Sequence, residues 1–503
     1  MRSRPVLSFA GLAVGLVLLT ACTGVAGKPF AEGTQGVIAG NRPATSTAPN
    51  APASMPLATG QQRASGGVIA SGGPLAPYNY APTIMVAGGQ YRMWWCSQLP
   101  GVPRAGDQIL YATATSPDGP FAAPDGAPGD LVFGNSPTGF DSLHTCDPSV
   151  LAVNGTYYLY YTGTGDPGGN DNAIGLAVSS DGVHWTRADN GVPIINAAND
   201  QTGHPYGAGQ PSAVYLDGWF YLMFTDTTGA ASADGSGQYV LRSADPAFQS
   251  GVQALGQHGF VPVAGATTPR LRSVVDATTS DLMWVDALNA FAIASGSPTG
   301  TTITFWDADF TYHPYRPLTL PGAETEGPGL VRRPDGHAPV DATDPCGRVP
   351  LDVVRPTTRG AGPDSLMHAG VDITGLHACD QPGPAQLLLN GFAVPAPDRT
   401  VDLVVNGKLV EVERRSVALA LAVGMDDDPP ASITALPVVA HLRAGAPAFA
   451  APGRPVGVLL DGGTLWPIGT ADVAQANSSP VTSVPVERWD AYPRGVDLAA
   501  LRP

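Results

Sequence analysis

Apolar and polar residues alternate between residues 80 and 295 in a layout that recurs four times. In each copy a short apolar run leads into a turn, and a second apolar run then opens on an aromatic residue. The first residue of each copy lies ten positions before that aromatic, as in Ala81/Tyr91, Asp147/Tyr157, Gln210/Phe220 and Asp281/Phe291. Apolar runs joined by Asn-Gly or Asp-Gly are typical of β-hairpins. The pattern predicts four hairpins with turns at Gly88-Gly89, Asn154-Gly155, Asp217-Gly218 and near Asn289.

A looser fifth copy begins at Glu326, and further strand-like runs follow the first three hairpins at Ile109, Ile174 and Tyr239. Each unit therefore amounts to about four short strands. Units of four strands, repeated around an axis, are typical of β-propellers. We predict an all-β chain in which residues 73–355 form a five-bladed β-propeller. A series of ordinary β-sandwiches is the alternative, and the shared register argues against it.

The repeat stops after about residue 355. Two more hairpins are predicted beyond it, one turning at Asn406-Gly407 and the other at Asp461-Gly462. We expect residues 356–503 to be a smaller, mainly-β accessory domain without catalytic residues.

The N-terminus has the pattern of an export signal. Arg2 and Arg4 precede an apolar run over residues 6–19, which ends in Leu-Thr-Ala-Cys22. The run is too short for a stable membrane-spanning helix. The small residues before Cys22 resemble the bacterial lipobox, which implies that residues 1–21 are a signal peptide and that Cys22 carries a lipid. We therefore expect an exported protein, lipid-anchored to the outer face of the bacterial cell membrane. An ordinary secretory signal is the alternative.

Residues 22–72 consist mainly of Ala, Gly, Pro, Ser and Thr. Such a composition buries too little apolar surface to fold. We predict that this segment is a disordered tether.

Four cysteines remain after Cys22, and an even number in an exported chain indicates two disulfides. Three pairings are possible. We favour Cys96–Cys146 and Cys346–Cys379, each of which closes a loop of a few tens of residues. Metal binding by the four cysteines is the alternative, but the chain has no Cys-x-x-Cys pair.

Composition narrows the possible partners. The 503 residues hold 26 Lys and Arg against 42 Asp and Glu, a formal net charge of −16. Phosphate-binding surfaces need a basic stripe, and none is visible, so we expect no nucleic-acid partner.

Several segments resemble the five-bladed glycoside hydrolase superfamily that holds the family 43 arabinanases and xylosidases. The matching runs are Asp147-Pro-Ser-Val with the Asn154-Gly155 hairpin, Ser179-Ser-Asp-Gly-Val-His-Trp185, Glu326-Gly-Pro and Tyr80-Ala-Pro. The resemblance implies a propeller and hydrolysis of an arabinose- or xylose-containing polysaccharide.

The first strands of propeller blades start near one mouth of the central channel, and here the predicted starts are Ala81, Asp147, Gln210, Asp281 and Glu326. Glycoside cleavage needs a general acid and a second carboxylate. A third carboxylate can raise the pKa of the acid by repulsion. The resemblance implies a fixed order of residues along the blades: a base Asp, a blade without a carboxylate, a pKa-setting Asp and an acid Glu. The predicted strand starts match this order when Asp147 is taken as the first. Asp147 is then the base, Asp281 the group that sets the pKa and Glu326 the acid.

This frame places Ala81 in the last blade and so requires a circular permutation. Tyr80 and Gln210 are expected to contact the sugar. Asp276 competes with Asp281, and the common register favours Asp281. The alternative function is that of a catalytically inactive glycan-binding propeller, because Ala81 and Gln210 stand where the unshifted frame wants carboxylates. We expect a monomer with a carbohydrate polymer as its partner and with neither cofactor nor metal.

Overall fold

The structure, a computed structural model, describes residues 53–99, 106–199, 204–229, 237–297, 299–322, 324–358, 363–396 and 400–501. The predicted signal peptide, the lipidation site Cys22 and most of the predicted tether lie outside these ranges. Within them, no helix combines the length and the apolar character needed to cross a bilayer.

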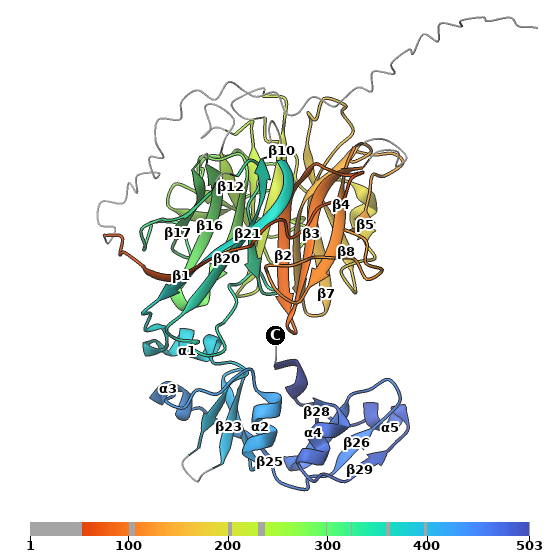
Figure 1. Cartoon of the computed structure of the whole chain (residues 1–503), viewed down its shortest axis with the longest axis vertical. Coiled ribbons are helices and arrows are strands. Elements are labelled where there is room, and N and C mark those ends of the chain that lie inside the picture. The colour runs from red at the N-terminus through yellow and green to blue at the C-terminus, as the bar shows by residue number, and fades with distance from the viewer. Residues whose placement is uncertain are drawn as a thin grey trace, which may run out of the picture. The chain divides into compact units, whose positions relative to one another are not determined.

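The chain is mainly β, and its first five groups of strands follow one another between residues 58 and 374 (Figure 1). The first group is β2 (Asn79–Ala87), β3 (Gln90–Leu99), β4 (Gly106–Ala114) and β5 (Asp130–Phe133). The second is β6 (His144–Val153), β7 (Thr156–Thr164), β8 (Ala173–Ser179) and β9 (Thr186–Arg187). The third is β10 (Ala208–Leu216), β11 (Trp219–Asp226), β12 (Gln238–Ser243), β13 (Gln253–Gly256) and β14 (Gly259–Pro262). The fourth is β15 (Ser280–Val285), β16 (Ala290–Ser297), β17 (Gly300–Trp306) and β18 (Leu318–Pro321). The fifth is β19 (Gly329–Arg332), β20 (Val349–Thr358), β21 (Pro363–Thr374) and β1 (Ala58–Ala64).

The first strands of these groups, β2, β6, β10, β15 and β19, are called the inner strands below. Each inner strand contacts the next one in this order, and β19 contacts β2 again. Strands β19 and β2 are also paired in parallel, through Val331–Ile84 and Arg332–Met85. The fifth group is therefore joined to the first through their inner strands.

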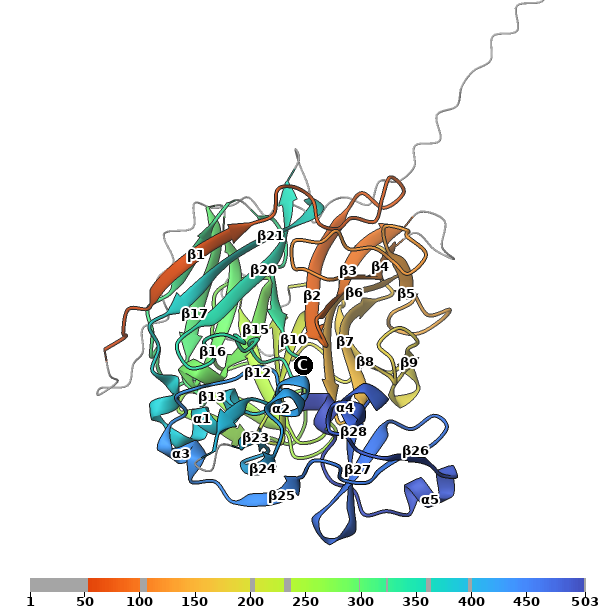
Figure 2. The same ribbon diagram turned by 60° about the horizontal axis from the view of Figure 1, so that its bottom comes forward.

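The outermost strand of the fifth group comes from the other end of the region. Strand β1 pairs antiparallel with β21, and Figures 1 and 2 show the two side by side. Arg63 of β1 forms an ion pair with Asp352 at 2.9 Å and another with Asp372. The predicted boundaries must be corrected: residues 58–64 are a strand rather than tether, and the sheet extends past residue 355. The pattern missed β1 because an exposed edge strand needs few apolar residues.

The predicted hairpin turns are confirmed. Asn154 and Gly155 have φ of 52° and 79°, and Asp217 and Gly218 have 51° and 83°. Two positive φ values in succession are the requirement of a two-residue type I′ turn, which Asn-Gly and Asp-Gly meet at low cost. In the first three hairpins, the aromatic residue that opens the second strand pairs with the residue five positions after the first residue of the copy. In the second hairpin, for example, Tyr157 pairs with Ala152, five positions after Asp147.

The fourth hairpin departs from this register. Phe291 pairs with Trp284, and a short 3₁₀ turn, η2 (Asp286–Leu288), lengthens the connection between β15 and β16. Five positions before Trp284 lies Thr279, so Thr279 and not Asp281 corresponds to Ala81, Asp147 and Gln210. Counting ten residues back from Phe291 reaches Asp281, two residues after the equivalent position. The error in the prediction arises because the loop of this hairpin is two residues longer than the loops of the other three.

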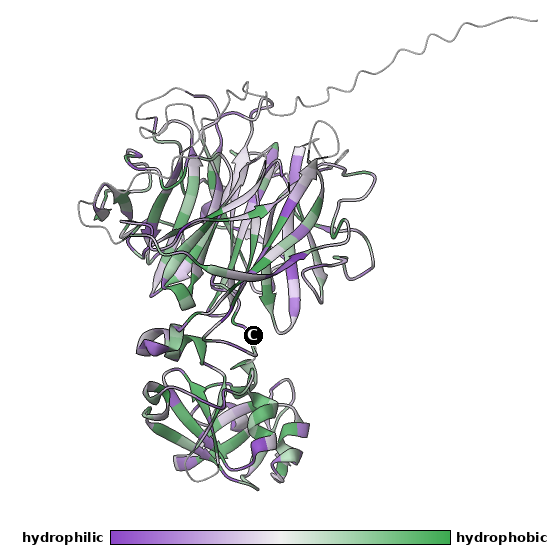
Figure 3. Cartoon of the chain, turned by 60° about the vertical axis from the view of Figure 1, so that its left-hand side comes forward, coloured by the Kyte–Doolittle hydropathy of each residue, from purple (hydrophilic) through white to green (hydrophobic). Residues whose placement is uncertain are grey.

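Apolar side chains fill the spaces between neighbouring groups. One cluster joins the first and second groups through Trp94, Tyr161 and Leu159, and similar clusters join each later pair. Figure 3 shows hydrophobic segments along the strands of these sheets. The packed sheets hold the ends of the inner strands at fixed positions.

Both predicted disulfides are confirmed. Cys96 is bonded to Cys146, with Cα atoms 5.2 Å apart, and Cys346 is bonded to Cys379, with Cα atoms 5.3 Å apart. The first bond links the β2–β5 group to β6, one residue before Asp147. It therefore ties the predicted base to the neighbouring sheet.

Two further four-stranded sheets and five short helices follow β21. One sheet is β22 (Ala393–Pro395), β23 (Val401–Val405), β24 (Lys408–Val412) and β25 (Val438–Leu442), and the other is β26 (Ala448–Ala450), β27 (Val456–Leu460), β28 (Thr464–Gly469) and β29 (Val481–Ser483). The helices are α1 (Pro382–Leu388), α2 (Arg415–Leu421), α3 (Ala431–Thr434), α4 (Ala471–Ala476) and α5 (Val486–Asp490). The predicted hairpins correspond to β23–β24 and β27–β28.

Candidate active site

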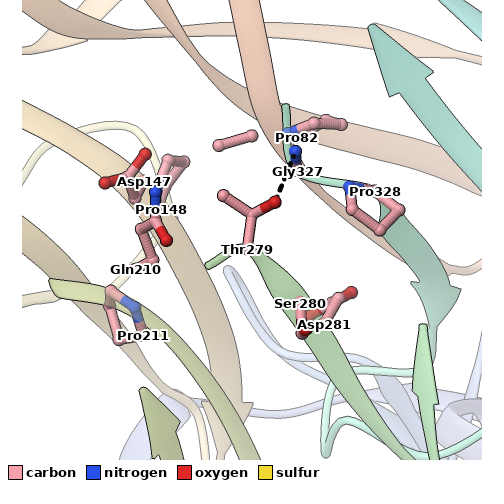
Figure 4. A pocket seen from close by; sticks show the side chains of 11 residues that line it. Pro82, Asp147, Pro148, Gln210, Pro211, Thr279, Ser280, Asp281, Gly327 and Pro328 are labelled. Carbon is pink, nitrogen blue, oxygen red and sulfur yellow. Dashed lines mark hydrogen bonds between the residues drawn. The ribbon is translucent and has the colours of Figure 1, made fainter. Parts of the chain in front are cut away.

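A hollow that opens to solvent lies where the starts of all five inner strands meet. Its walls are Ala81, Pro82, Asp147, Pro148, Gln210, Pro211, Thr279, Ser280, Asp281, Gly327 and Pro328. Figure 4 shows Asp147 and Gln210 facing the hollow from one side and Thr279 with Gly327 from the other. The structure thus brings together the strand starts that the repeat predicted to converge.

The rim of this hollow is strained. Ala81, Asp147 and Gln210 are not glycines, yet they have φ of 43°, 48° and 53°, and each precedes a proline. Each of the three residues lies within an irregularity of its strand's register, such as a β-bulge. Left-handed backbone costs about 1–3 kcal/mol for such residues and is concentrated at functional sites. Gly327, at φ 71°, occupies the same position in the fifth copy without this cost.

Asp147 is a buried carboxylate that the protein only partly compensates. The residue is 8% exposed, and its Oδ1 atom accepts no hydrogen bond from the residues that the structure describes. Burial raises the pKa of Asp147 to about 7, and the nearby Asp107 charge adds to this rise, whereas a hydrogen bond from Thr162 opposes it. A carboxylate that changes its charge near neutral pH suits a general base.

Glu326 is the second carboxyl group beside the hollow. It immediately precedes the wall residue Gly327 and accepts a hydrogen bond from the Tyr78 hydroxyl to Oε2 at 2.8 Å. Burial raises the pKa of Glu326 to about 8, with the charges of Asp147 and Asp107 adding to the effect. Glu326 therefore holds its proton to a higher pH than Asp147 does.

Asp281 lies in the wall of the hollow, but its carboxylate is engaged elsewhere. Oδ2 accepts the backbone N–H of Leu330 at 2.7 Å, and Oδ1 lies 3.3 Å from the guanidinium of Arg332. Thr83, Ser149 and Ser212 have the same position in the other inner strands, and each accepts a backbone N–H of the next inner strand. The carboxylate of Asp281 thus belongs to a ring of contacts between strands.

Arg332 stands at the centre of this ring. The residue is 1% exposed, and its guanidinium donates to Leu282 O at 2.7 Å, Ala213 O at 3.1 Å and Thr83 Oγ1 at 2.9 Å. These acceptors belong to three different inner strands. Arg332 therefore ties β19 to β15, β10 and β2 below the hollow.

The two predicted sugar contacts have different outcomes. Tyr80 is 4% exposed, and its hydroxyl donates to Asp107 Oδ2 at 3.0 Å, so it lies behind the site and not at its surface. Gln210 lines the hollow, where its Oε1 atom accepts from Thr225 at 3.3 Å. Tyr78, two residues before Tyr80, is the tyrosine that contacts Glu326.

Sequence reasoning missed Tyr78, Asp107 and Thr162. Asp107 is the second residue of β4, which is not an inner strand, so the search for strand starts at the channel mouth did not reach it. Tyr78 lies just before the repeat begins, and Thr162 lies near the end of β7. Each is brought to the site by tertiary packing, and no local motif marks it.

Asp147→Asn is expected to stabilise the fold above about pH 7 and to leave it unchanged below about pH 4. The pKa of Asp147 is about 7 in the folded protein against an ordinary value of 3.8. The unfolded state therefore ionises first, and folding loses stability as the pH rises between these two values. An amide avoids this loss, although it is itself costly to bury, so we expect a gain of about 1–2 kcal/mol.

Urea denaturation at pH 4 and pH 8 measures this gain. Asp427→Asn is the matched control, because that side chain is 79% exposed. Equal stability of Asp147→Asn and the native protein at pH 8 would contradict the burial of an uncompensated charge.

Comparisons with known proteins give no sequence relative: no protein family matches the chain, and no curated protein does. Among solved structures, a family 117 glycoside hydrolase of Zobellia galactanivorans is similar at 14% identity, covering 65% of this chain and 93% of that one, with a TM-score of 0.44. An α-L-arabinofuranosidase of Podospora anserina in complex with cellotriose is 12% identical over 65% of this chain and 99% of its own, with a TM-score of 0.38. The catalytic domain of a Coprinopsis cinerea GH62 α-L-arabinofuranosidase is 11% identical over 63% and 97%, with a TM-score of 0.38.

Proposed function

We propose that the five groups of strands form a five-bladed β-propeller and that the hollow at its mouth is the active site of a glycoside hydrolase. The cyclic contacts of the inner strands and the pairing of β1 with β21 support the propeller. The observation that carries the function is the pair of carboxyl groups Asp147 and Glu326, which titrate near neutral pH beside one hollow.

The two carboxyl groups have different roles, one as general acid and one as general base, because they differ in their affinity for protons. Glu326, with its pKa at about 8, is protonated at neutral pH and donates its proton to the leaving glycosidic oxygen. Asp147, with its pKa at about 7, ionises first and accepts a proton from the attacking water. Because each negative charge disfavours the other, the pair passes readily through the singly protonated state that hydrolysis needs.

The substrate that we propose is a polysaccharide containing arabinose or xylose. The resemblance of the Asp147-Pro-Ser-Val, Glu326-Gly-Pro and hairpin motifs to family 43 glycosidases supports this choice. The same resemblance favours inversion at the anomeric carbon, with water between the two carboxyl groups.

Incubation of the full chain with arabinan, arabinoxylan and xylan tests this proposal. Released sugars are quantified by chromatography, and the anomer formed first is identified by proton NMR. Release of arabinose or xylose with inverted configuration supports the function. Tight binding by calorimetry without any release would overturn hydrolysis and favour the glycan-binding alternative, to which Ala81 and Gln210 at the rim point.

We further propose that the chain is exported and anchored through a lipid on Cys22. Cys22→Ala is then expected to move the protein from the membrane fraction to the soluble fraction of the bacterial culture. Immunoblots of fractionated cells measure this, and Cys22→Ala should leave glycosidase activity per molecule unchanged. Retention of the variant in the membrane would argue for another means of attachment.

A further inference from the structure

Asp107 is a buried carboxylate that the acid–base pair does not include. It is the second residue of β4, is 9% exposed and lies behind Tyr80, whose hydroxyl donates to Oδ2 at 3.0 Å. His144 Nδ1 lies 3.1 Å from the same oxygen. The other oxygen, Oδ1, is buried and has no hydrogen-bond partner among the described residues. The contacts with Tyr80 and His144 thus fix the position of the Asp107 carboxylate, but one of its two oxygens has no hydrogen bond to offset the cost of burial.

The surroundings of Asp107 screen its charge poorly. A carboxylate oxygen of Asp107 lies within 4.8 Å of the sulfur atoms of Cys96 and Cys146. Because these cysteines form a disulfide, they are neither metal ligands nor charged groups. Tyr80 packs on the same disulfide. An apolar wall of this kind lets a charge act over a longer distance than water would.

Two tyrosine rings connect Asp107 to Glu326. The rings of Tyr78 and Tyr80 meet edge to face with centroids 5.1 Å apart. The Tyr78 hydroxyl donates to Glu326 at 2.8 Å, and the Tyr80 hydroxyl donates to Asp107. On the other side, His144 belongs to β6, three residues before Asp147.

We propose that Asp107, held by Tyr80 and His144, is the third carboxylate of the site, a positioning residue whose negative charge keeps the proton on Glu326. This inference rests on the proposed function and replaces Asp281 in the role that the sequence assigned to it. The ionisable groups that face Asp107 are Tyr80 from β2, Tyr78 before it, and His144 and Asp147 from β6, with Glu326 next to Tyr78.

The charges around Glu326 agree in sign with this role. Asp107 contributes to the raised pKa of both Glu326 and Asp147, while His144 lowers the pKa of Asp147. Asp281 is paired with Arg332 and is not among the groups that shift the pKa of Glu326. Asp107 and His144 therefore act in opposite directions on the pKa of Asp147.

The test is a direct titration of Glu326 in the full chain, independent of any hydrolysis. The chain has six glutamates, so ¹³C-carboxyl labelling of Glu gives few signals, and Glu326→Gln identifies the one of interest. Asp107→Asn preserves shape and an acceptor for Tyr80. We expect it to lower the midpoint of the Glu326 signal by about one pH unit. Asp427→Asn removes the same charge at an exposed position and should leave the midpoint unchanged.

A second variant keeps the proposal falsifiable if Asp107→Asn folds poorly. His144→Gln removes the imidazole that faces Asp107 and that lowers the pKa of Asp147, so it should raise the Asp147 midpoint, a shift opposite in sign to that of Asp107→Asn. Labelled aspartate reports it. An unchanged Glu326 midpoint in Asp107→Asn, or shifts of one sign in both variants, would overturn the role of Asp107. Such a result would not touch the proposed hydrolysis, which is judged by sugar release.

The pH dependence of kcat/KM supplies a readout for the catalytic consequence. Loss of the Asp107 charge should move the alkaline limb of the profile down by about one pH unit, because Glu326 then loses its proton earlier. A uniform fall in activity at every pH, with the limb in place, would indicate a merely structural role and would contradict the proposal.

Discussion

Replacement of Glu326 by Gln is expected to lower polysaccharide hydrolysis by about 10²–10⁴-fold while leaving the fold intact. Gln keeps the size of the side chain and an oxygen that accepts from Tyr78, but it has no proton to give to the leaving oxygen. The loss should be smaller on an aryl glycoside, because a phenolate leaves with little protonation. Initial rates on both substrates, with folding checked by circular dichroism, measure the effect.

Glu324→Gln is the matched control for this prediction. Glu324 is also buried, two residues earlier, but its carboxylate accepts from Thr301 and lies 3.9 Å from Arg355, away from Tyr78. We expect its activity to stay close to that of the native protein. Full activity in both Glu326→Gln and Asp147→Asn would refute the acid–base pair, and an equal loss in Glu324→Gln would assign the effect to structure.

Arg332→Met is expected to destabilise the protein by about 3–5 kcal/mol, the usual cost of leaving one member of a buried ion pair alone. Arg332 and Asp281 are 1% and 6% exposed, so water cannot replace the lost guanidinium. The variant also removes donors from carbonyl groups of two other inner strands. Urea denaturation at pH 7 measures the change.

The double variant Asp281→Asn/Arg332→Met separates charge from packing. It removes the stranded carboxylate while keeping an acceptor for the N–H of Leu330, so it should recover a large part of the lost stability. Arg454→Met is a surface control, because the pair of Arg454 with Asp490 is about 40% exposed on both sides and should leave stability unchanged. If the double variant is no more stable than Arg332→Met, the unpaired charge of Asp281 is not the cause of the lost stability.

The local parts of the fold were predictable because their causes are local. Asn154-Gly155 and Asp217-Gly218 adopt the left-handed backbone that a two-residue hairpin needs, so the sequence marks those turns directly. The pairing of Cys96 with Cys146 followed from their places at the end of one predicted strand and the start of another. In contrast, β1 was missed because an edge strand is stabilised by its pairing with β21 and by the ion pairs of Arg63, not by an apolar pattern.

Only those site residues that belong to the repeated hairpins could be predicted from the sequence. The shared layout predicted that Asp147, Gln210 and Glu326 lie at or next to the starts of inner strands. The reason is that residues at the same position in each repeated hairpin occupy the same position in each group of strands. The two extra loop residues after β15 moved Thr279 into the position assigned to Asp281. A count along the chain cannot see this shift, because it depends on which residues pair across the hairpin.

The sequence by itself thus determined the repeated hairpins and their tight turns, favoured the observed disulfide pairing, and pointed to two of the three proposed carboxylates, all of which depend on residue type and short spacings. Only the tertiary structure decided which charges act on one another. Asp281 is neutralised by Arg332, which comes from another strand, while Asp107 reaches the site from β4 through Tyr80 and Tyr78. The strength of a charge depends on burial and on partners distant in the chain, and these exist only once the sheets have packed together.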